Sequence, residues 1–95
     1  MIILAKAIVT LKIMPESPDI DLEKISEGAL EKIKGFAGEG ETKREIEPVA
    51  FGLKALKIIF VMDEQKGSTD PLEKEIQAVE GVNSVEIIDV RRAIG

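Results

Sequence analysis

The stretch ILAKAIVTLKI, residues 3–13, decides how the rest of the chain is arranged. Every odd-numbered position in it is apolar, while the even-numbered positions include two lysines and a threonine. An alternation of period two over this length predicts a β-strand with one buried face. Its other face is left to solvent or to a partner, and Pro15 is expected to end the strand.

Two later segments show the periodicity of helices. Residues 17–35 offer Ser17 as a cap, Pro18 for the first helical position and Gly35 as a stop. Residues 69–81 repeat this arrangement, with a proline near the start and a glycine at the end. The apolar residues recur at spacings of three and four on one face of each helix: Leu22, Ile25, Ala29 and Ile33 in the first, and Leu72, Ile76 and Val79 in the second.

Three further segments are predicted to be strands. Residues 42–46 are mostly charged, which favours an edge strand. Residues 53–64 and 82–94 are richer in aliphatic residues. The parity of the apolar positions slips near residues 54–57, which indicates either a bulge or a strand end that is covered on both sides.

The order of elements is therefore strand, helix, strand, strand, helix, strand, in two halves of similar length. This order predicts an α+β fold of the ferredoxin-like β-α-β-β-α-β type, as a single domain over residues 1–95. Right-handed crossovers place both helices on one face of a four-stranded antiparallel sheet.

The composition excludes several classes of function. The 95 residues include no cysteine and no histidine, so the chain lacks a thiolate nucleophile, the commonest general base and the commonest metal ligand. We expect no catalytic set, no metal site and no cofactor. The net charge of −5 argues against direct contact with nucleic acid. Neither a membrane span nor a secretory signal is evident, which predicts a soluble, cytoplasmic protein.

Two features remain unexplained by the fold. The segment PVAFGLKAL, residues 48–56, places the aromatic Phe51 between turn-forming residues. Phe51 is either an ordinary buried aromatic residue or an anchor that a loop presents to a partner's pocket. Gly52 beside it would permit a close approach of the partner's backbone, or a turn that few other residues could make. Near the terminus, Arg91 and Arg92 either belong to a solvated tail, pair with a nearby glutamate, or reach an anionic site on another protein.

Three motifs stand out along the chain: MPESPD at residues 14–19, EPVAFGLKAL at residues 47–56 and DVRR at residues 89–92. Taken in order and spacing, they resemble the archaeal elongation factor 1-beta family, the stand-alone relatives of the eukaryotic factor's C-terminal exchange domain. The resemblance covers nearly the whole chain. It implies a ferredoxin-like guanine-nucleotide exchange factor of translation elongation, with no bond chemistry of its own. The implied partner is the GTPase elongation factor 1-alpha, in its GDP- or GTP-bound and nucleotide-free forms.

The resemblance also implies roles for particular residues. In the eukaryotic relatives an aromatic residue of the matching loop inserts into the GTPase, and a lysine near the C-terminus disturbs its magnesium and phosphate site. Phe51, with Pro48 and Gly52, falls on that loop, and Arg92 falls on the lysine, with Arg91 as the alternative register. Arginine departs from lysine in preferring bidentate acceptors. The two groups are implied to act jointly on the partner's nucleotide pocket.

One alternative function uses the same order of elements. A regulatory module that senses amino acids or other small molecules would bind its ligand at an interface between sheets or helices. Calorimetry against amino acids, or capture with the GTPase, would separate the two functions.

Overall fold

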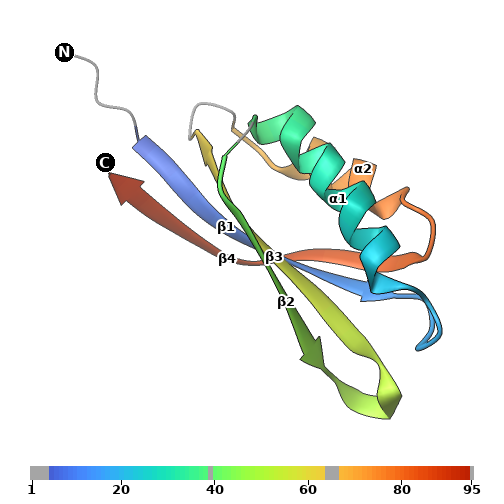
Figure 1. The fold of residues 1–95 in the computed structure, drawn as a ribbon. Coiled ribbons are helices and arrows are strands. Elements are labelled where there is room, and N and C mark those ends of the chain that lie inside the picture. Colours follow the sequence, from blue (N-terminus) through green and yellow to red (C-terminus); the bar gives the residue numbers. More distant parts are fainter. Residues whose placement is uncertain (1–4, 39, 64–66, 95) are drawn as a thin grey trace.

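The computed structural model describes residues 5–38, 40–63 and 67–94, and these residues form one four-stranded sheet with two helices. The elements are β1 (Ala5–Pro15), α1 (Leu22–Ala37), β2 (Thr42–Pro48), β3 (Lys54–Asp63), α2 (Asp70–Gln77) and β4 (Val82–Ile94). All neighbouring strands are antiparallel in the order β2-β3-β1-β4, and both helices cover the same face (Figure 1). The predicted ferredoxin-like fold is confirmed. Of the predicted strand at residues 3–13, residues 3 and 4 lie outside the described residues. Residue 64, the last of the predicted strand at residues 53–64, also lies outside them.

The core lies between the sheet and the helices. The odd-numbered residues of β1 and the even-numbered residues of β3 face it, as period two requires. Its buried members are Ala7, Val9, Leu11, Ile13, Ile25, Ala29, Ile33, Leu56, Ile58, Phe60, Met62, Leu72, Ile76 and Val82. Because the helices cover only one face of the sheet, most of the alternate side chains remain at least partly exposed on the opposite face.

The two ends of α1 differ from the prediction. The helix begins at Leu22 because Asp21, in an extended conformation, accepts a hydrogen bond from the backbone N–H of Glu23 at 2.9 Å. Ser17 instead belongs to a turn before the helix. At the other end Gly35 does not stop the helix, since Phe36 and Ala37 pack against the core and continue it. The helix ends at Gly38, whose positive φ of 83° favours glycine.

Helix α2 ends at Gln77, before the predicted stop at Gly81. Val79 lies in the turn that follows and still packs against the core. The position of Val79 also explains the glycine inside α1, because a Cβ atom on Gly28 would lie 3.0 Å from Cγ1 of Val79. Gly28 therefore permits close contact between α1 and the end of α2, at a helix-propensity cost of about 1 kcal/mol.

The slip in parity at the start of β3 is not a bulge. The register of β3 with β1 and with β2 is continuous, while Ala55 and Leu56 are both buried. The strand is therefore covered on both sides at this end, which was the second of the two predicted explanations. A register shift occurs instead in the pairing of β1 with β4, between Thr10 and Leu11.

The edge strand β2 is tied to the helix layer by one side chain. Arg44 donates to Oε2 of Glu23 at 3.1 Å and to Oγ of Ser26 at 2.9 Å. Ser26 is only 1% exposed, so this contact satisfies a buried hydroxyl as well as an exposed carboxylate. The charged composition that predicted an edge strand thus also holds that strand against α1.

Candidate partner-binding site

Phe51 lies at the tip of the hairpin that joins β2 to β3, in the short turn η1 (Ala50–Gly52), and is 94% exposed. Of the two interpretations of this aromatic residue, burial in the core is therefore wrong. A phenyl ring left in water forgoes the roughly 1.5–3 kcal/mol that full burial provides. Its position is explained neither by packing nor by solubility.

The backbone of the turn adds a second cost. Phe51 has φ 60° and ψ 33°, Gly52 has φ 75°, and the N–H of Leu53 donates to the carbonyl of Ala50 at 3.2 Å. These values describe a type I′ turn, whose first central position favours asparagine, aspartate or glycine. An aromatic residue there costs about 1 kcal/mol. Conformational strain of this kind is typical of residues kept for binding.

The neighbouring site residues build the turn. The positive φ of Gly52 supports the interpretation that it makes a turn few other residues could make. Pro48 is the last residue of β2 and pairs with Lys54 at the base of the hairpin. The N–H of Val49 donates to the carbonyl of Leu53 at 2.8 Å, which closes the hairpin below Phe51.

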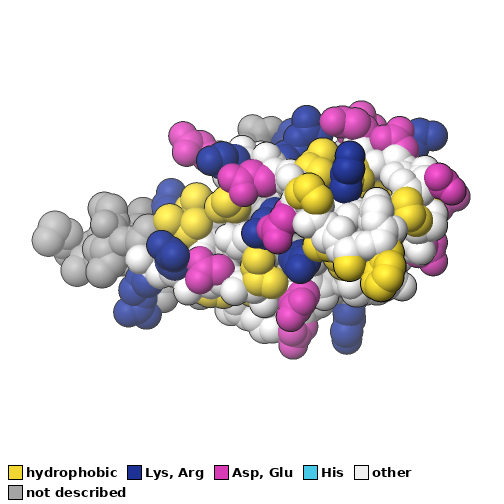
Figure 2. All heavy atoms as spheres, turned by 90° about the horizontal axis from the view of Figure 1, so that it is seen from below, with side chains coloured by type: hydrophobic (Ala, Val, Ile, Leu, Met, Phe, Trp, Pro, Cys, Tyr) yellow, Lys and Arg dark blue, Asp and Glu magenta, His cyan; other side chains and the backbone are white. Residues whose placement is uncertain are grey.

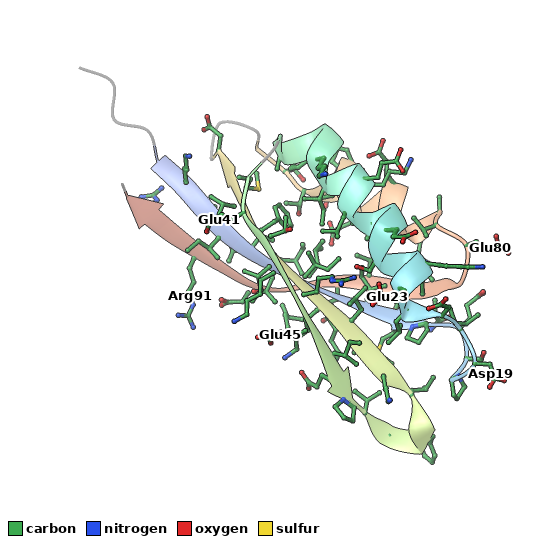
Figure 3. The ribbon with its side chains drawn as sticks, in the orientation of Figure 1. Asp19, Glu23, Glu41, Glu45, Glu80 and Arg91 are labelled. Atoms are coloured by element: carbon green, nitrogen blue, oxygen red, sulfur yellow. The ribbon has the colours of Figure 1, made fainter. Side chains whose placement is uncertain are left out.

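The two arginines lie near the end of β4, on opposite faces of the sheet. Arg92 pairs with Ala7, which is buried on the helix side, whereas Arg91 pairs with Ile8 on the uncovered side. Figure 3 shows Arg91 directed away from the helices. Its Nε donates to Oδ2 of Asp89 at 3.0 Å, and its side chain remains 77% exposed. Only one of the two arginines can therefore point toward a partner that binds one face.

The structure does not bring Phe51 and the arginines together. Arg91 is aligned through Ile8 with Val61, while the base of the Phe51 hairpin is at Lys54. Seven residues along β3, at about 3.3 Å each, separate these positions by about 23 Å. Figure 1 accordingly shows the hairpin and the C-terminus at opposite ends of the sheet. A partner that contacts both groups must meet them at two separate places, and their joint action on one nucleotide pocket stays a prediction.

The uncovered face of the sheet carries charges of both signs. Among the described residues, the ion pairs on this face include Lys43 with Glu45, Lys57 with Glu47, and Arg91 with Asp89. The view from below the sheet in Figure 2 shows basic and acidic side chains interspersed, with hydrophobic side chains between them. The hydrogen bond from Lys57 lowers the pKa of Glu47, and the same bond raises the pKa of Lys57. The positive charges of Lys43, Lys57 and Arg91 on this face are thus each paired with an acidic neighbour.

One exposed residue was not singled out from the sequence. Ile46 is the only large aliphatic residue of β2 and is 55% exposed, although it points to the helix side of the sheet. The available signal was an isoleucine in the otherwise charged and polar segment TKREIEP. Ile46 and Phe51 belong to the same hairpin, so the exposed apolar surface at this end of the sheet is larger than one ring.

Within the described ranges, no group of three or more acidic side chains is placed to hold a metal ion. None of the helices in the same part of the chain is long and apolar enough to cross a bilayer.

The sequence of this chain matches the EF-1 guanine nucleotide exchange domain over residues 8–93, a span that includes Phe51 and both arginines. The chain belongs to this exchange-domain family. Elongation factor 1-beta of Staphylothermus marinus is 48% identical over 92 residues, which cover 94% of this chain and 98% of that protein. Elongation factor 1-beta of Methanothermobacter thermautotrophicus is 41% identical over 85 residues, covering 90% of this chain and 93% of the relative.

The resemblance seen in the three motifs is thus confirmed at the level of the family. As a member of the elongation factor 1-beta family, the chain is an exchange factor of translation elongation. For such a factor the relevant features are exposed surfaces, and the geometry above offers two candidates: the strained, exposed Phe51 turn and the arginine-bearing end of β4.

Proposed function

We propose that this protein promotes GDP release from elongation factor 1-alpha, and its reloading with GTP, by binding the nucleotide-free GTPase more tightly than the GDP-bound one. The observation that carries the proposal is the 94% exposure of Phe51 on a left-handed turn. The protein needs no bond chemistry of its own for this function.

The mechanism is a coupling between two ligands of the GTPase. If the exchange factor weakens GDP binding by some factor, GDP weakens binding of the exchange factor by the same factor. Couplings of this kind are typically 1–3 kcal/mol, or about 5- to 150-fold. Full burial of the Phe51 ring, worth about 1.5–3 kcal/mol, is of this size. One aromatic residue that fits only the nucleotide-free form can therefore provide much of the coupling.

The end of β4 supplies the second contact. A guanidinium of Arg91 or Arg92 would compete with magnesium for carboxylate and phosphate oxygens of the GTPase, which weakens the metal's hold on GDP. This contact lies about 23 Å from the Phe51 hairpin, as judged along β3. The factor would therefore act on the nucleotide site from two sides and not through one wedge.

The direct test measures binding of this chain to purified elongation factor 1-alpha, with and without GDP and magnesium, together with release of labelled GDP. We expect tighter binding without nucleotide and faster GDP release with the factor present. Phe51→Ala should leave the domain folded and slow that release. Equal affinity for the nucleotide-free and GDP-bound GTPase would reject the proposed function.

The cytoplasmic location expected from the sequence, which this function requires, stays a prediction.

A further inference from the structure

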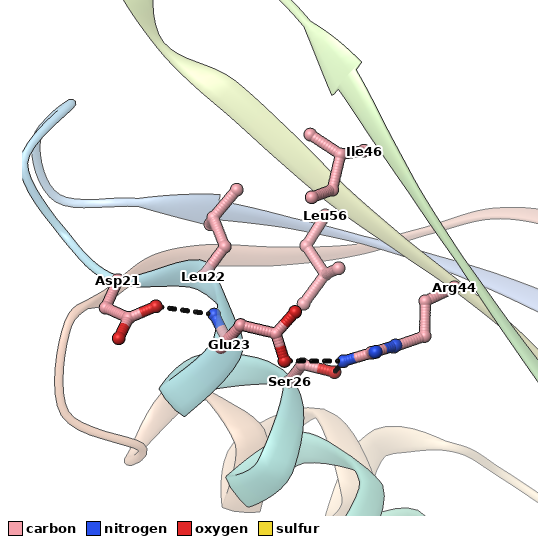
Figure 4. Close-up of a pocket in the computed structure, with 7 residues that line it drawn as sticks. All are labelled: Asp21, Leu22, Glu23, Ser26, Arg44, Ile46 and Leu56. Atoms are coloured by element: carbon pink, nitrogen blue, oxygen red, sulfur yellow. Dashed lines mark hydrogen bonds and ion pairs between the residues drawn. The ribbon is translucent and has the colours of Figure 1, made fainter.

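The exposed apolar surface of the hairpin continues into a groove between β2 and the start of α1. The groove has two adjoining lobes of about 370 and 380 Å³. Asp21, Leu22 and Ile46 line both lobes, so the two lobes are contiguous. Figure 4 shows the inner lobe, with Ile46, Leu56 and Leu22 on one side and the Glu23–Arg44 pair beside them.

The groove runs from the Phe51 hairpin toward the ion pair between Arg44 and Glu23. Its outer lobe is lined by Gly52 and Lys54, the residues that follow Phe51 in the hairpin. At its inner end Arg44 reaches from β2 to Glu23 and Ser26, which closes the groove. From Pro48 to Arg44 the edge strand spans four residues, or about 13 Å. This length suits a short segment of a partner that lies beside the Phe51 contact.

Charges of opposite sign lie on opposite rims of the groove. Glu23 is already paired with Arg44, which leaves Asp21 on the α1 rim and Lys54 on the hairpin rim. In the described residues, Asp21 accepts the hydrogen bond from the backbone N–H of Glu23 through one carboxylate oxygen, Oδ1. A matching segment would carry a basic group toward Asp21, an acidic group toward Lys54 and an aliphatic side chain between them.

From these observations we infer that this groove binds a segment of the GTPase that adjoins the pocket for Phe51, with an aliphatic side chain packed on Ile46. The inference rests on the proposed function and names a second contact of the same interface. It also accounts for Ile46, an aliphatic residue that the fold leaves 55% exposed on a charged edge strand. The polar and charged residues at the rim of the groove would exclude water from Ile46 and from the aliphatic side chain packed on it.

The test compares Ile46→Thr with Ile88→Thr in binding to nucleotide-free elongation factor 1-alpha. Threonine is β-branched like isoleucine, so strand propensity is kept while apolar surface is lost. Ile88 is the matched control, because it is 42% exposed on β4, at the other edge of the sheet. We expect Ile46→Thr to weaken binding about 10-fold and Ile88→Thr to change it less than about 2-fold. Lys54→Glu, a rim substitution that leaves the apolar floor intact, should also weaken binding.

The outcomes separate this inference from the proposed function. If Phe51→Ala slows exchange while Ile46→Thr and Lys54→Glu both bind at the wild-type affinity, the groove is not part of the interface. If the wild-type chain neither binds the GTPase nor accelerates GDP release, the proposed function fails first. Self-association of the wild-type chain that Ile46→Thr abolishes would assign the groove to a second copy and overturn the inference.

Discussion

Replacing Phe51 by asparagine should make this protein more stable and less active at once. The substitution places the dipeptide asparagine–glycine at the centre of the type I′ turn, which is the most favourable pair for that turn. Asparagine accepts the left-handed conformation that Phe51 adopts at φ 60°. The change therefore relieves strain that the wild-type chain carries at the hairpin tip.

The magnitude follows from two terms. Relief of the left-handed strain contributes about 1 kcal/mol. Because Phe51 is 94% exposed, the burial it loses is about 6% of at most 3 kcal/mol, or roughly 0.2 kcal/mol. The net gain of about 0.8 kcal/mol corresponds to a rise of about 3–6 °C in the unfolding midpoint of a domain of this size. Loss of an aromatic anchor worth about 2 kcal/mol should lower kcat/KM for GDP release about 30-fold.

The assay pairs thermal unfolding with GDP release, and Phe51→Tyr serves as the control that keeps both ring and strain. We expect the tyrosine variant to match the wild type in unfolding midpoint and to retain most of the exchange activity. A fall in the midpoint of Phe51→Asn would mean that the ring stabilises the folded domain. Unchanged GDP release would mean that the ring is not an anchor, and either result refutes the reasoning.

Three further predictions follow from other parts of the structure. Arg91→Ala and Arg92→Ala, made singly, should slow GDP release unequally because the two side chains lie on opposite faces of β4. The double variant should slow GDP release more than it lowers the unfolding midpoint. Equal effects of the single variants would mean that the partner does not meet one face of β4 in preference to the other. Glu47→Gln should lower the unfolding midpoint at neutral pH, since Lys57 holds the pKa of Glu47 below its ordinary value of 4.5 and the stability this provides is present above that value. The difference from the wild type should shrink as the pH falls through the lowered pKa of Glu47 and vanish once that carboxylate is protonated. A difference that persists in the protonated state would exclude the ion pair as its source. Gly28→Ala should change stability little by itself but stabilise by about 1 kcal/mol in a Val79→Ala background, because the clash of the new Cβ atom with Val79 then disappears; equal effects of Gly28→Ala in the two backgrounds would show that this contact does not select glycine.

The boundaries of α1 show the limit of predicting helix ends from local sequence patterns. Ser17 and Pro18 form a reasonable helix start when taken alone, yet Asp21 provides the cap. At the other end Gly35 is a reasonable stop, yet packing of the next two residues extends the helix. The start was decided among several acceptable local signals by a local hydrogen bond, whereas the end depended on packing against residues distant in the chain.

The two groups of site residues show the same limit. Motif resemblance singled out Phe51 and the two arginines from the sequence, but their separation along β3 follows from strand register, which joins residues far apart in the chain. The exposure of Ile46 could not be predicted from the sequence, because it depends on which part of the sheet α1 covers.

The chain's own periodicity was enough to establish the strands, the helices, their order and the buried face of β1, because each of these depends on residues within a few positions of one another. Solvent exposure and distance between sites are properties of the packed molecule. The exposed, left-handed Phe51, the groove beside it and the opposite placement of the arginines became visible only once sheet and helices were assembled. The physical reason is that burial and register are determined by contacts between segments, and alternation along one segment does not specify its neighbours.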